Sequence, residues 1–262
     1  PHPDRNRSYQ LAKEYAKNKK IIIIHGAEIT RDLPPGHSNA LFINDANKLV
    51  QENYIDAFRE AKKQGAFIFW NHPNWIGQNK QGITQLTPTH EVLLEEGLLN
   101  GIEVTNENSF ADRALTIANE IGLTILATSD IHELIDWLFD IPGGGHRPVT
   151  LVFAKERSEI GVKDALFDGR TVAWYQNNLI GQEKYLVPLI KSSLTVDTAY
   201  YQMYGNTKTH IANVVISNQS DATYLINNES NFSFYNTTNV VQLNPQTITT
   251  LSVKTIESLS SF

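Results

Sequence analysis

Short apolar runs alternate with stretches of helical periodicity from about residue 5 to residue 182. The runs expected to form strands are 20–30, 40–44, 66–71, 101–106, 123–130, 148–154 and 170–175. The stretches with helical spacing are 7–18, 45–65, 86–99, 110–122 and 158–169. Alternating strands and helices are typical of βα units around a parallel sheet. The pattern therefore predicts one α/β domain, which we place at residues 1–185.

The pattern changes near residue 190, where Asn, Ser, Thr and Tyr become frequent. Short segments of alternating character follow one another, separated by turn residues, at 211–218, 222–228, 231–236, 239–245 and 247–255. Such spacing is typical of small antiparallel sheets and sandwiches. We therefore predict a second, all-β and sandwich-like domain at residues 190–262.

Composition narrows the possible partners and ligands of the 262-residue chain. Its net charge of −6 lacks the clustered cations that binding to a nucleic-acid backbone requires, so nucleic acid is not expected as a bulk partner. The apolar run "IIII" is far shorter than the roughly 20 residues of a membrane span. The absence of cysteine leaves His, Asp and Glu as the metal ligands. Oligomeric state stays open, as does the choice between periplasm and cytoplasm.

Polar residues of metal-binding type stand at the ends of several predicted strands. They are Glu28 in "HGAEIT", His37 in "PPGHSNALF", His72 in "FWNHP", and Asp130 and His132 in "TSDIH". Functional groups of parallel βα domains collect where the strands end, and imidazoles with carboxylates suit Zn, Mn or Fe. Asp130 and His132 are two apart, so on an extended chain they point the same way. We expect these five residues to share one site.

Each of these residues also has a structural interpretation when taken alone. A single histidine such as His72 is more often a hydrogen-bonding group at a strand end than a ligand, and Glu28 alone is more often an ion-pair partner. Five such residues at successive strand ends favour the metal site. His25 is expected to face the helix layer, and His90, at a predicted helix start, to lie on the surface.

Several motifs resemble one known family. "GAEIT", "GHSNALF", "WNHP", "GIEVTN" and "ATSDIH", in this order, are similar to the later motifs of the PHP (polymerase and histidinol phosphatase) family of metal-dependent phosphoesterases. "HRPVTLVFAKERS" and "DALFDGRTVAW" resemble its bacterial two-domain branch. The resemblance implies a distorted (β/α)7 barrel with two or three metal ions. It implies that Glu28 bridges the first and second ions, that His37 and His72 complete the second, and that Asp130 and His132 bind the first and third.

The chain departs from the family at its beginning. The family starts with His-x-His on the first strand and a Thr-Asp-His-like motif on the second, and neither is present. "PHPD" imitates His-x-Asp, but His2 and Asp4 stand at the wrong place to replace them. We therefore expect an N-terminally incomplete barrel with an exposed sheet edge, or an inactive remnant. The site of Glu28, His37 and His72 keeps all its implied ligands, so this chain is expected to bind one ion.

The resemblance implies hydrolysis of a small phosphomonoester or phosphodiester by metal-activated water. His146 is a candidate proton donor to the leaving group, and Arg147 and Lys163 are candidate phosphate contacts, although loop packing and solvated charge explain them equally well. Trp70, Trp75 and Trp137 either wall the pocket or fill the core. Two alternatives remain: a metal-dependent hydrolase of another bond, and a noncatalytic protein that binds metal or carbohydrate.

Overall fold

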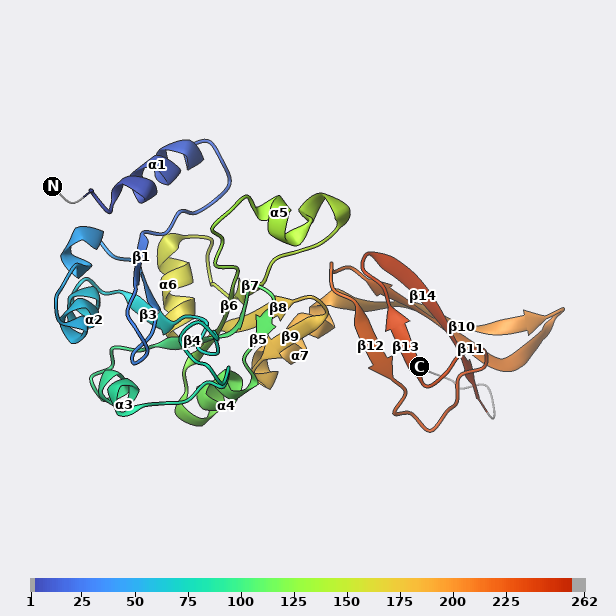
Figure 1. Ribbon diagram of the computed structural model, residues 1–262. Helices are drawn as coiled ribbons and strands as arrows, with labels where there is room; N and C mark the ends of the chain where they lie inside the picture. Colours follow the sequence, from blue (N-terminus) through green and yellow to red (C-terminus); the bar gives the residue numbers. More distant parts are fainter. Residues whose placement is uncertain (1–2, 256–262) are drawn as a thin grey trace. The chain divides into compact units, whose positions relative to one another are not determined.

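The computed structural model describes residues 3–255, so His2 lies outside the described part of the chain. By its internal contacts the chain divides into two compact units after Gln182, and the two are described separately (Figure 1). Among the described residues, none of the helices combines the length and the apolar character that crossing a bilayer requires.

The first unit is built on a mixed sheet of six strands. Five of them are neighbours in the order β1 (Gly26–Ile29), β2 (Ser38–Leu41), β3 (Phe67–Trp70), β4 (Gly101–Asn106) and β5 (Ser109–Phe110). The sixth strand, β6 (Thr124–Thr128), also pairs with β4. The pairs β3–β4 and β4–β6 are parallel, as predicted, whereas β1–β2 and β2–β3 are antiparallel. The prediction of a wholly parallel sheet is wrong because eight residues between β1 and β2 are too few for a crossover, which needs a dozen or more.

A smaller antiparallel sheet follows in the same unit, formed by β7 (Val149–Val152), β8 (Thr171–Tyr175) and β9 (Asn178–Gly181). Threonine side chains connect it to β6. The Thr150 hydroxyl donates to the carbonyl of Ala127 and accepts from its N–H, and the Thr171 hydroxyl donates to the carbonyl of Ile125. Side-chain hydrogen bonds therefore join β6 to β7 and β8, although no backbone ladder connects them.

Helices cover both faces of the main sheet, which explains its apolar strands. The helical segments of this unit are α1 (Arg7–Ala16), η1 (Ala46–Leu49), α2 (Tyr54–Lys63), α3 (Pro88–Glu95), α4 (Asp112–Ile121), α5 (Ile135–Phe139), η2 (Ile141–Gly143) and α6 (Glu159–Phe167). Along β3, Ile68 and Trp70 join the larger core with residues of α2 and α4, whereas Phe67 and Phe69 pack with Leu166 of α6. All four residues are buried because each face of the strand meets a helix layer.

Two predicted elements differ from the structure. The strand predicted at 20–30 is limited to β1, and Ile21 is 52% exposed. Pairing stops there because β2 ends at Leu41 and the chain turns, so that Phe42 and Ile43 donate to the carbonyl of His25. The helix predicted at 45–65 is divided into η1 and α2, because the Asn53 side chain accepts from Ile55 N and begins a new helix.

The second unit is one helix followed by an all-β region. The helix is α7 (Glu183–Ser193), and the strands are β10 (Leu194–Tyr204), β11 (Thr207–Asn218), β12 (Tyr224–Asn227), β13 (Val240–Leu243) and β14 (Thr247–Lys254). The strands form a sheet in the order β10–β11–β14 and a separate β12–β13 pair. The predicted strand at 231–236 contributes only a single bridge between Phe234 and Val253.

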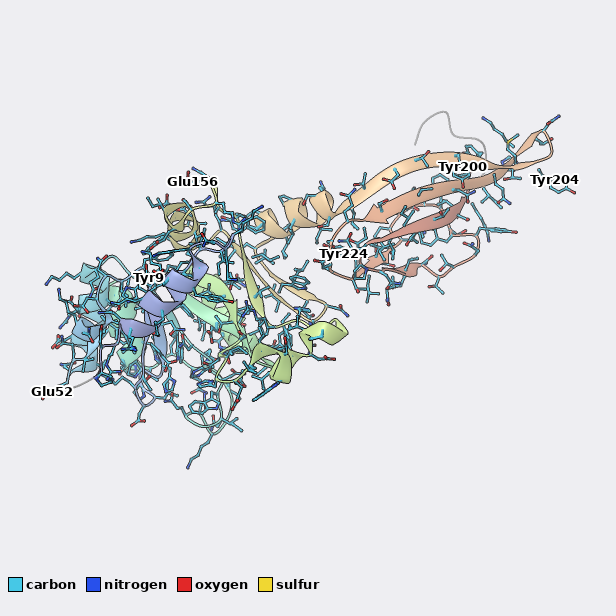
Figure 2. The ribbon with its side chains drawn as sticks, turned by 90° about the horizontal axis from the view of Figure 1, so that it is seen from above. Tyr9, Glu52, Glu156, Tyr200, Tyr204 and Tyr224 are labelled. Carbon is cyan, nitrogen blue, oxygen red and sulfur yellow. The ribbon has the colours of Figure 1, made fainter. Side chains whose placement is uncertain are left out.

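Of the β10–β11 hairpin, only residues 211–218 were predicted as a strand. The turn end of the hairpin exposes aromatic side chains, so it lacks the alternation of apolar and polar residues that predicts a half-buried strand. Figure 2 shows Tyr204 at the tip of this hairpin and Tyr200 further back along β10. Tyr204 is 86% exposed, and Gly205 makes the turn at a φ of 57°, which glycine adopts readily. The core of the all-β region is small and includes Tyr224, Leu243 and Leu251.

Candidate metal centre

Strand pairing brings Glu28 and His37 together. Glu28 lies in β1 and pairs with Asn39, whereas His37 immediately precedes β2, so the two side chains are diagonal neighbours on adjacent strands. His37 Nδ1 lies 3.0 Å from Glu28 Oε1, and the Thr30 hydroxyl donates to the same carboxylate oxygen over 2.7 Å. The carboxylate is thus oriented by a neighbouring hydroxyl and faces an imidazole.

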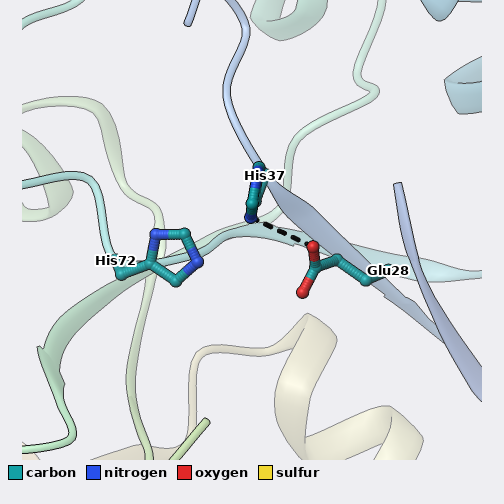
Figure 3. Close-up of side chains that lie close together, drawn as sticks. All are labelled: Glu28, His37 and His72. Carbon is teal, nitrogen blue, oxygen red and sulfur yellow. Dashed lines mark ion pairs between the residues drawn. The ribbon is translucent and has the colours of Figure 1, made fainter. Parts of the chain in front are cut away.

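The register between β2 and β3 brings His72 to the same place. Ser38 pairs with Trp70, and Asn71 N donates to the carbonyl of His37, so the residues just outside the two strands lie side by side. The rings of His37 and His72 are 4.9 Å apart (Figure 3). One ligand atom from each of Glu28, His37 and His72 lies within 4.8 Å of the other two. The structure therefore brings together the three residues that the sequence predicted as one site.

These separations fit a bound divalent ion. Two ligand atoms that each lie about 2.1 Å from a tetrahedral ion are about 3.4 Å apart, so small side-chain rotations bring the three atoms onto one ion. Burial lowers the pKa of His72, which keeps its ring neutral as metal binding requires. Two imidazoles and one carboxylate are the donor set of many zinc sites that keep an open position.

A buried carboxyl group supports His72 from behind. Glu103 lies in the middle of β4 and is 1% exposed. It accepts hydrogen bonds from His72 N (2.6 Å), from Asn106 Nδ2 (2.9 Å) and from the Thr128 hydroxyl (2.5 Å). Burial raises the pKa of Glu103 to about 7. His72 has a φ of 27°, an uncommon conformation for a residue other than glycine, and the bond to its N–H holds the backbone there.

Glu103 was not predicted from the sequence, although a signal existed. Ile102 and Val104, its neighbours in the strand, are both buried, so this strand is covered on both faces. A carboxylate in such a strand must be paired or hydrogen-bonded, so its presence there points to a supporting role for other polar groups nearby.

A second group of ligand-type residues lies at the ends of β4 and β6. Asn106 pairs with Thr128, so the residues that follow these strands are neighbours. One ligand atom each of Glu107, Asp130 and His132 lies within 4.8 Å of the other two. Asp130 has a φ of 45°, so the chain is not extended as predicted; the carboxylate and the imidazole approach each other through a turn instead. Glu107 was not singled out from the sequence.

The two groups face one cavity of about 510 Å³. Its lining consists of Glu28, His37, His72, Asn74, Trp75, Ile76, Gly82, Asn106, Glu107, Ser109, Asp130 and His132. His72 Nε2 lies 3.8 Å from Asp130 Oδ2, which places the two groups in direct proximity. All five predicted metal ligands therefore lie around the same cavity, together with Glu107.

The two predicted catalytic residues lie elsewhere among the described residues. The His146 ring lies 4.6 Å from that of Trp174, tilted against it by 30°, and its ring nitrogens lie 3.1 Å from the carbonyls of Arg147 and Gln176. Neither His146 nor Arg147 lines the cavity. Lys163 lies over the ring of Phe42 instead. The catalytic roles of His146 and Arg147 stay predictions.

Of the three tryptophans considered for the pocket wall, only Trp75 lines the cavity among the described residues. Trp75 lines the cavity, with its ring 5.7 Å from that of His37 and 5.4 Å from that of His72. Trp70 is buried in the core, and Trp137 is exposed outside the cavity lining. Trp75 is therefore the one tryptophan of the three that lies beside the histidine pair.

The prediction that His90 lies on the surface is wrong. His90 is 1% exposed, its ring stacks 4.0 Å from that of Trp70, and its Nε2 lies 2.9 Å from the carbonyl of Pro35. It stands in the first turn of α3, where its Nδ1 accepts from the N–H of Thr87. The prediction failed because this helix turn packs against the core.

His25 stacks on Tyr9 of α1, which confirms that it faces the helix layer.

Comparisons with known proteins agree with this arrangement. Residues 194–262 match a family described as an Ig-like domain. The chain is similar to a solved structure from Bacteroides vulgatus, a two-domain protein containing a predicted PHP-like metal-dependent phosphoesterase. The two share 37% identity with a TM-score of 0.87, and the similarity covers 98% of this chain and 73% of that protein. Among curated proteins no significant match is found.

An α/β unit that gathers histidines and carboxylates around one cavity, followed by an Ig-like unit, defines the class as a two-domain metal-dependent hydrolase. At this identity and coverage the family follows as well. The chain belongs to the family of two-domain proteins with a PHP-like metal-dependent phosphoesterase domain.

Proposed function

We propose that the chain hydrolyses a small phosphomonoester or phosphodiester with the aid of divalent Zn, Mn or Fe. The observation that supports this most is the convergence of Glu28, His37 and His72 on one cavity, beside Asp130 and His132. The predicted PHP-like phosphoesterase of the similar Bacteroides protein supports the choice of phosphoester.

The domain architecture is part of the same proposal. Residues 1–185 form the phosphoesterase domain, with strands belonging to a distorted (β/α)7 barrel, and residues 190–262 form an accessory β-sandwich-like domain. The similarity to the structure with a predicted PHP-like domain and the parallel pairs β3–β4 and β4–β6 support the barrel assignment. The Ig-like match supports the accessory assignment.

Glu28, His37 and His72 would hold one divalent ion, and Asp130 would reach the same region from β6. When bound, such an ion lowers the pKa of a coordinated water and neutralises charge on phosphoryl oxygens. The protein's own contribution is positioning. Glu103 fixes the His72 backbone, Thr30 orients the Glu28 carboxylate, and the Trp75 ring lies against the His72 ring.

A phosphatase assay tests this function. Metal-free chain is supplied with Mn²⁺ or Zn²⁺ and assayed on p-nitrophenyl phosphate and bis(p-nitrophenyl) phosphate. Turnover is expected only with added metal, and Asp130→Asn should abolish it because the amide is a weak metal ligand. Asp136→Asn is the matched control, since Asp136 is exposed in α5 outside the cavity lining. Unchanged turnover in Asp130→Asn, or turnover without metal, would refute the proposal.

A further inference from the structure

The sheet of the second unit carries a hollow of about 640 Å³ that has no part in the metal centre. Its lining consists of Tyr200, Tyr201, Gln202, Met203, Asn213, Tyr235, Asn236 and Ser252. Aromatic rings and uncharged polar groups make up most of this lining, and none of its described residues is charged. The volume lies in the range of ligand sites, roughly 300–1,000 Å³. The lining therefore suits a ligand that is polar and uncharged.

Strand register places four of these side chains in one row. Tyr200 of β10 pairs with Asn213 of β11, and Asn213 pairs with Ser252 of β14. Tyr235, whose neighbour in the chain forms the bridge to β14, lies opposite Ser252 and donates from its N–H to the Ser252 carbonyl over 2.7 Å. Directly opposite residues share one face of a sheet. The row thus has a tyrosine at each end, with an amide and a hydroxyl between them.

This row lies on the face of the sheet that is turned away from the core. The adjacent residues Tyr201 and Ala212 pair with each other and are buried, whereas Tyr200 and Tyr235 are 50% and 56% exposed. Successive side chains of a strand alternate between the two faces. The core therefore explains Tyr201 but not the two outer rings, and exposed apolar surface of this kind marks interaction sites.

The spacing and chemistry of the row match a chain of sugar units. Neighbouring strands lie about 4.8 Å apart, so the three steps from Tyr200 to Tyr235 span about 14 Å, more than a single sugar ring covers. The negative face of each tyrosine ring attracts the partly positive C–H groups on the face of a sugar. Ser252 Oγ donates to Asn213 Oδ1 over 2.8 Å, which orients the amide. Amides and hydroxyls both donate and accept, as sugar hydroxyls do.

The charge of the hollow distinguishes carbohydrate from single-stranded nucleic acid. Tyrosine rings also stack on bases, but such sites need a positively charged groove for the backbone. The described lining has no charged residue. The nearby lysines lie over rings instead, with Lys208 Nζ 6.0 Å from the ring centre of Tyr201 and Lys254 Nζ 5.9 Å from that of Tyr235.

We propose that the outer face of the β10–β11–β14 sheet binds a neutral oligosaccharide. The rings of Tyr200 and Tyr235 stack on two of its sugar units, and the Asn213 amide forms hydrogen bonds with the hydroxyls between them. The site belongs to the second unit, needs no metal ion and is independent of the proposed phosphoesterase activity.

Affinity electrophoresis of the full chain tests the proposal. Native gels with EDTA contain arabinoxylan, galactomannan, soluble starch or mixed-linkage β-glucan, and one gel contains anionic polygalacturonate. At least one neutral polysaccharide is expected to retard wild type, and polygalacturonate is not. Tyr200→Ala and Tyr235→Ala should each weaken this binding about tenfold or more, as the loss of an aromatic anchor does. Both rings are half exposed, so the far-UV circular dichroism should stay unchanged.

Two further variants serve as controls. Tyr204→Ala removes an exposed tyrosine of the same strand outside the lining and should keep the wild-type retardation. Tyr200→Phe keeps the ring and should retain most of the binding, because stacking needs the ring rather than the hydroxyl.

The contrary outcomes are distinct. Equal retardation of wild type, Tyr200→Ala and Tyr235→Ala would refute the site. No retardation in any neutral gel, or retardation by polygalacturonate alone, would refute the choice of ligand. If sedimentation shows that Tyr200→Ala turns a dimer into a monomer, this face joins two copies of the chain and the inference is wrong. None of these results changes the outcome of the phosphatase assay, so the two proposals fail separately.

Discussion

His72 and His90 are two histidines of the same domain, both largely removed from water, with opposite surroundings. Both ring nitrogens of His90 are hydrogen-bonded to the protein, one to Thr87 and one to Pro35, and its face is covered by Trp70. His72 Nε2 instead lies 3.8 Å from the Asp130 carboxylate, beyond hydrogen-bonding distance, and its ring meets His37 across a cavity. The partners of the ring nitrogens, rather than burial, distinguish a structural histidine from a candidate ligand.

Replacing each histidine should separate the two roles, and the largest effect is expected at His72. His72→Ala removes one of three ligands and should weaken Zn²⁺ binding to its site more than about 100-fold, beyond the usual effect of losing a supporting residue. His90→Gln should leave the affinity unchanged, since His90 faces the core. Isothermal titration of metal-free protein measures both. Equal loss of affinity in the two variants would remove the distinction between them.

Glu103 should show an intermediate effect, because it touches the His72 backbone without lining the cavity. Glu103→Ala leaves the donors of His72, Asn106 and Thr128 without this acceptor, and each unsatisfied buried donor costs about 1–3 kcal/mol. We expect a clear loss in the free energy of unfolding and Zn²⁺ binding weaker by about 10- to 100-fold.

The conservative variant Glu103→Gln tests whether this effect is one of positioning. Its amide oxygen can still accept from His72 N, and its amide can donate to the Thr128 hydroxyl, so most of the Zn²⁺ affinity should return. Glu95→Ala serves as the control for loss of a carboxylate outside the site. Zn²⁺ affinity that is unaffected in Glu103→Ala would show that Glu103 supports only the fold.

The smallest effect concerns His90 and appears only as a dependence on pH. Burial lowers the pKa of His90 to about 4, because a charged ring would lose its hydration in the core. The unfolded chain takes up this proton near pH 6.5 and the folded chain does not. This contribution to stability is therefore complete above pH 6.5 and is lost as the pH falls towards 4, by up to about 1.4 kcal/mol per pH unit.

Urea unfolding followed by tryptophan fluorescence can isolate that contribution. All four tryptophans lie in the first unit, so their signal reports its unfolding. In EDTA, His90→Gln should flatten the pH dependence between 6.5 and 4.5, whereas His210→Gln, at an exposed position of the second unit, should not. The same slope in wild type and His90→Gln would contradict the assignment.

The sequence predicted the fold where local pattern decides it. The apolar runs at β3, β4 and β6 identified buried strands. Polar residues at the ends of predicted strands identified five neighbours of one cavity, which are Glu28, His37, His72, Asp130 and His132. The direction of β1 and β2 was not predictable in the same way, since a short connection makes them antiparallel despite similar residues.

The roles of Glu107, Glu103 and His90 depend on contacts between elements that are distant in the sequence. Glu107 stands one position after the "GIEVTN" motif, and its proximity to His132 depends on the β4–β6 register. Glu103 interrupts an apolar strand, but its role depends on the Asn-His turn that follows β3. His90 was misplaced because the polarity of a first helical turn does not reveal that Trp70 packs over it. Tertiary packing decides all three.

The central claim is that Glu28, His37 and His72 hold a divalent ion. Crystals of the chain grown with Zn²⁺ and measured on both sides of the zinc absorption edge test it directly. We predict an anomalous difference peak about 2.0–2.2 Å from a carboxylate oxygen of Glu28 and from one ring nitrogen each of His37 and His72. A zinc-loaded crystal with no peak among these three side chains, or with His72 turned away from it, would contradict the account.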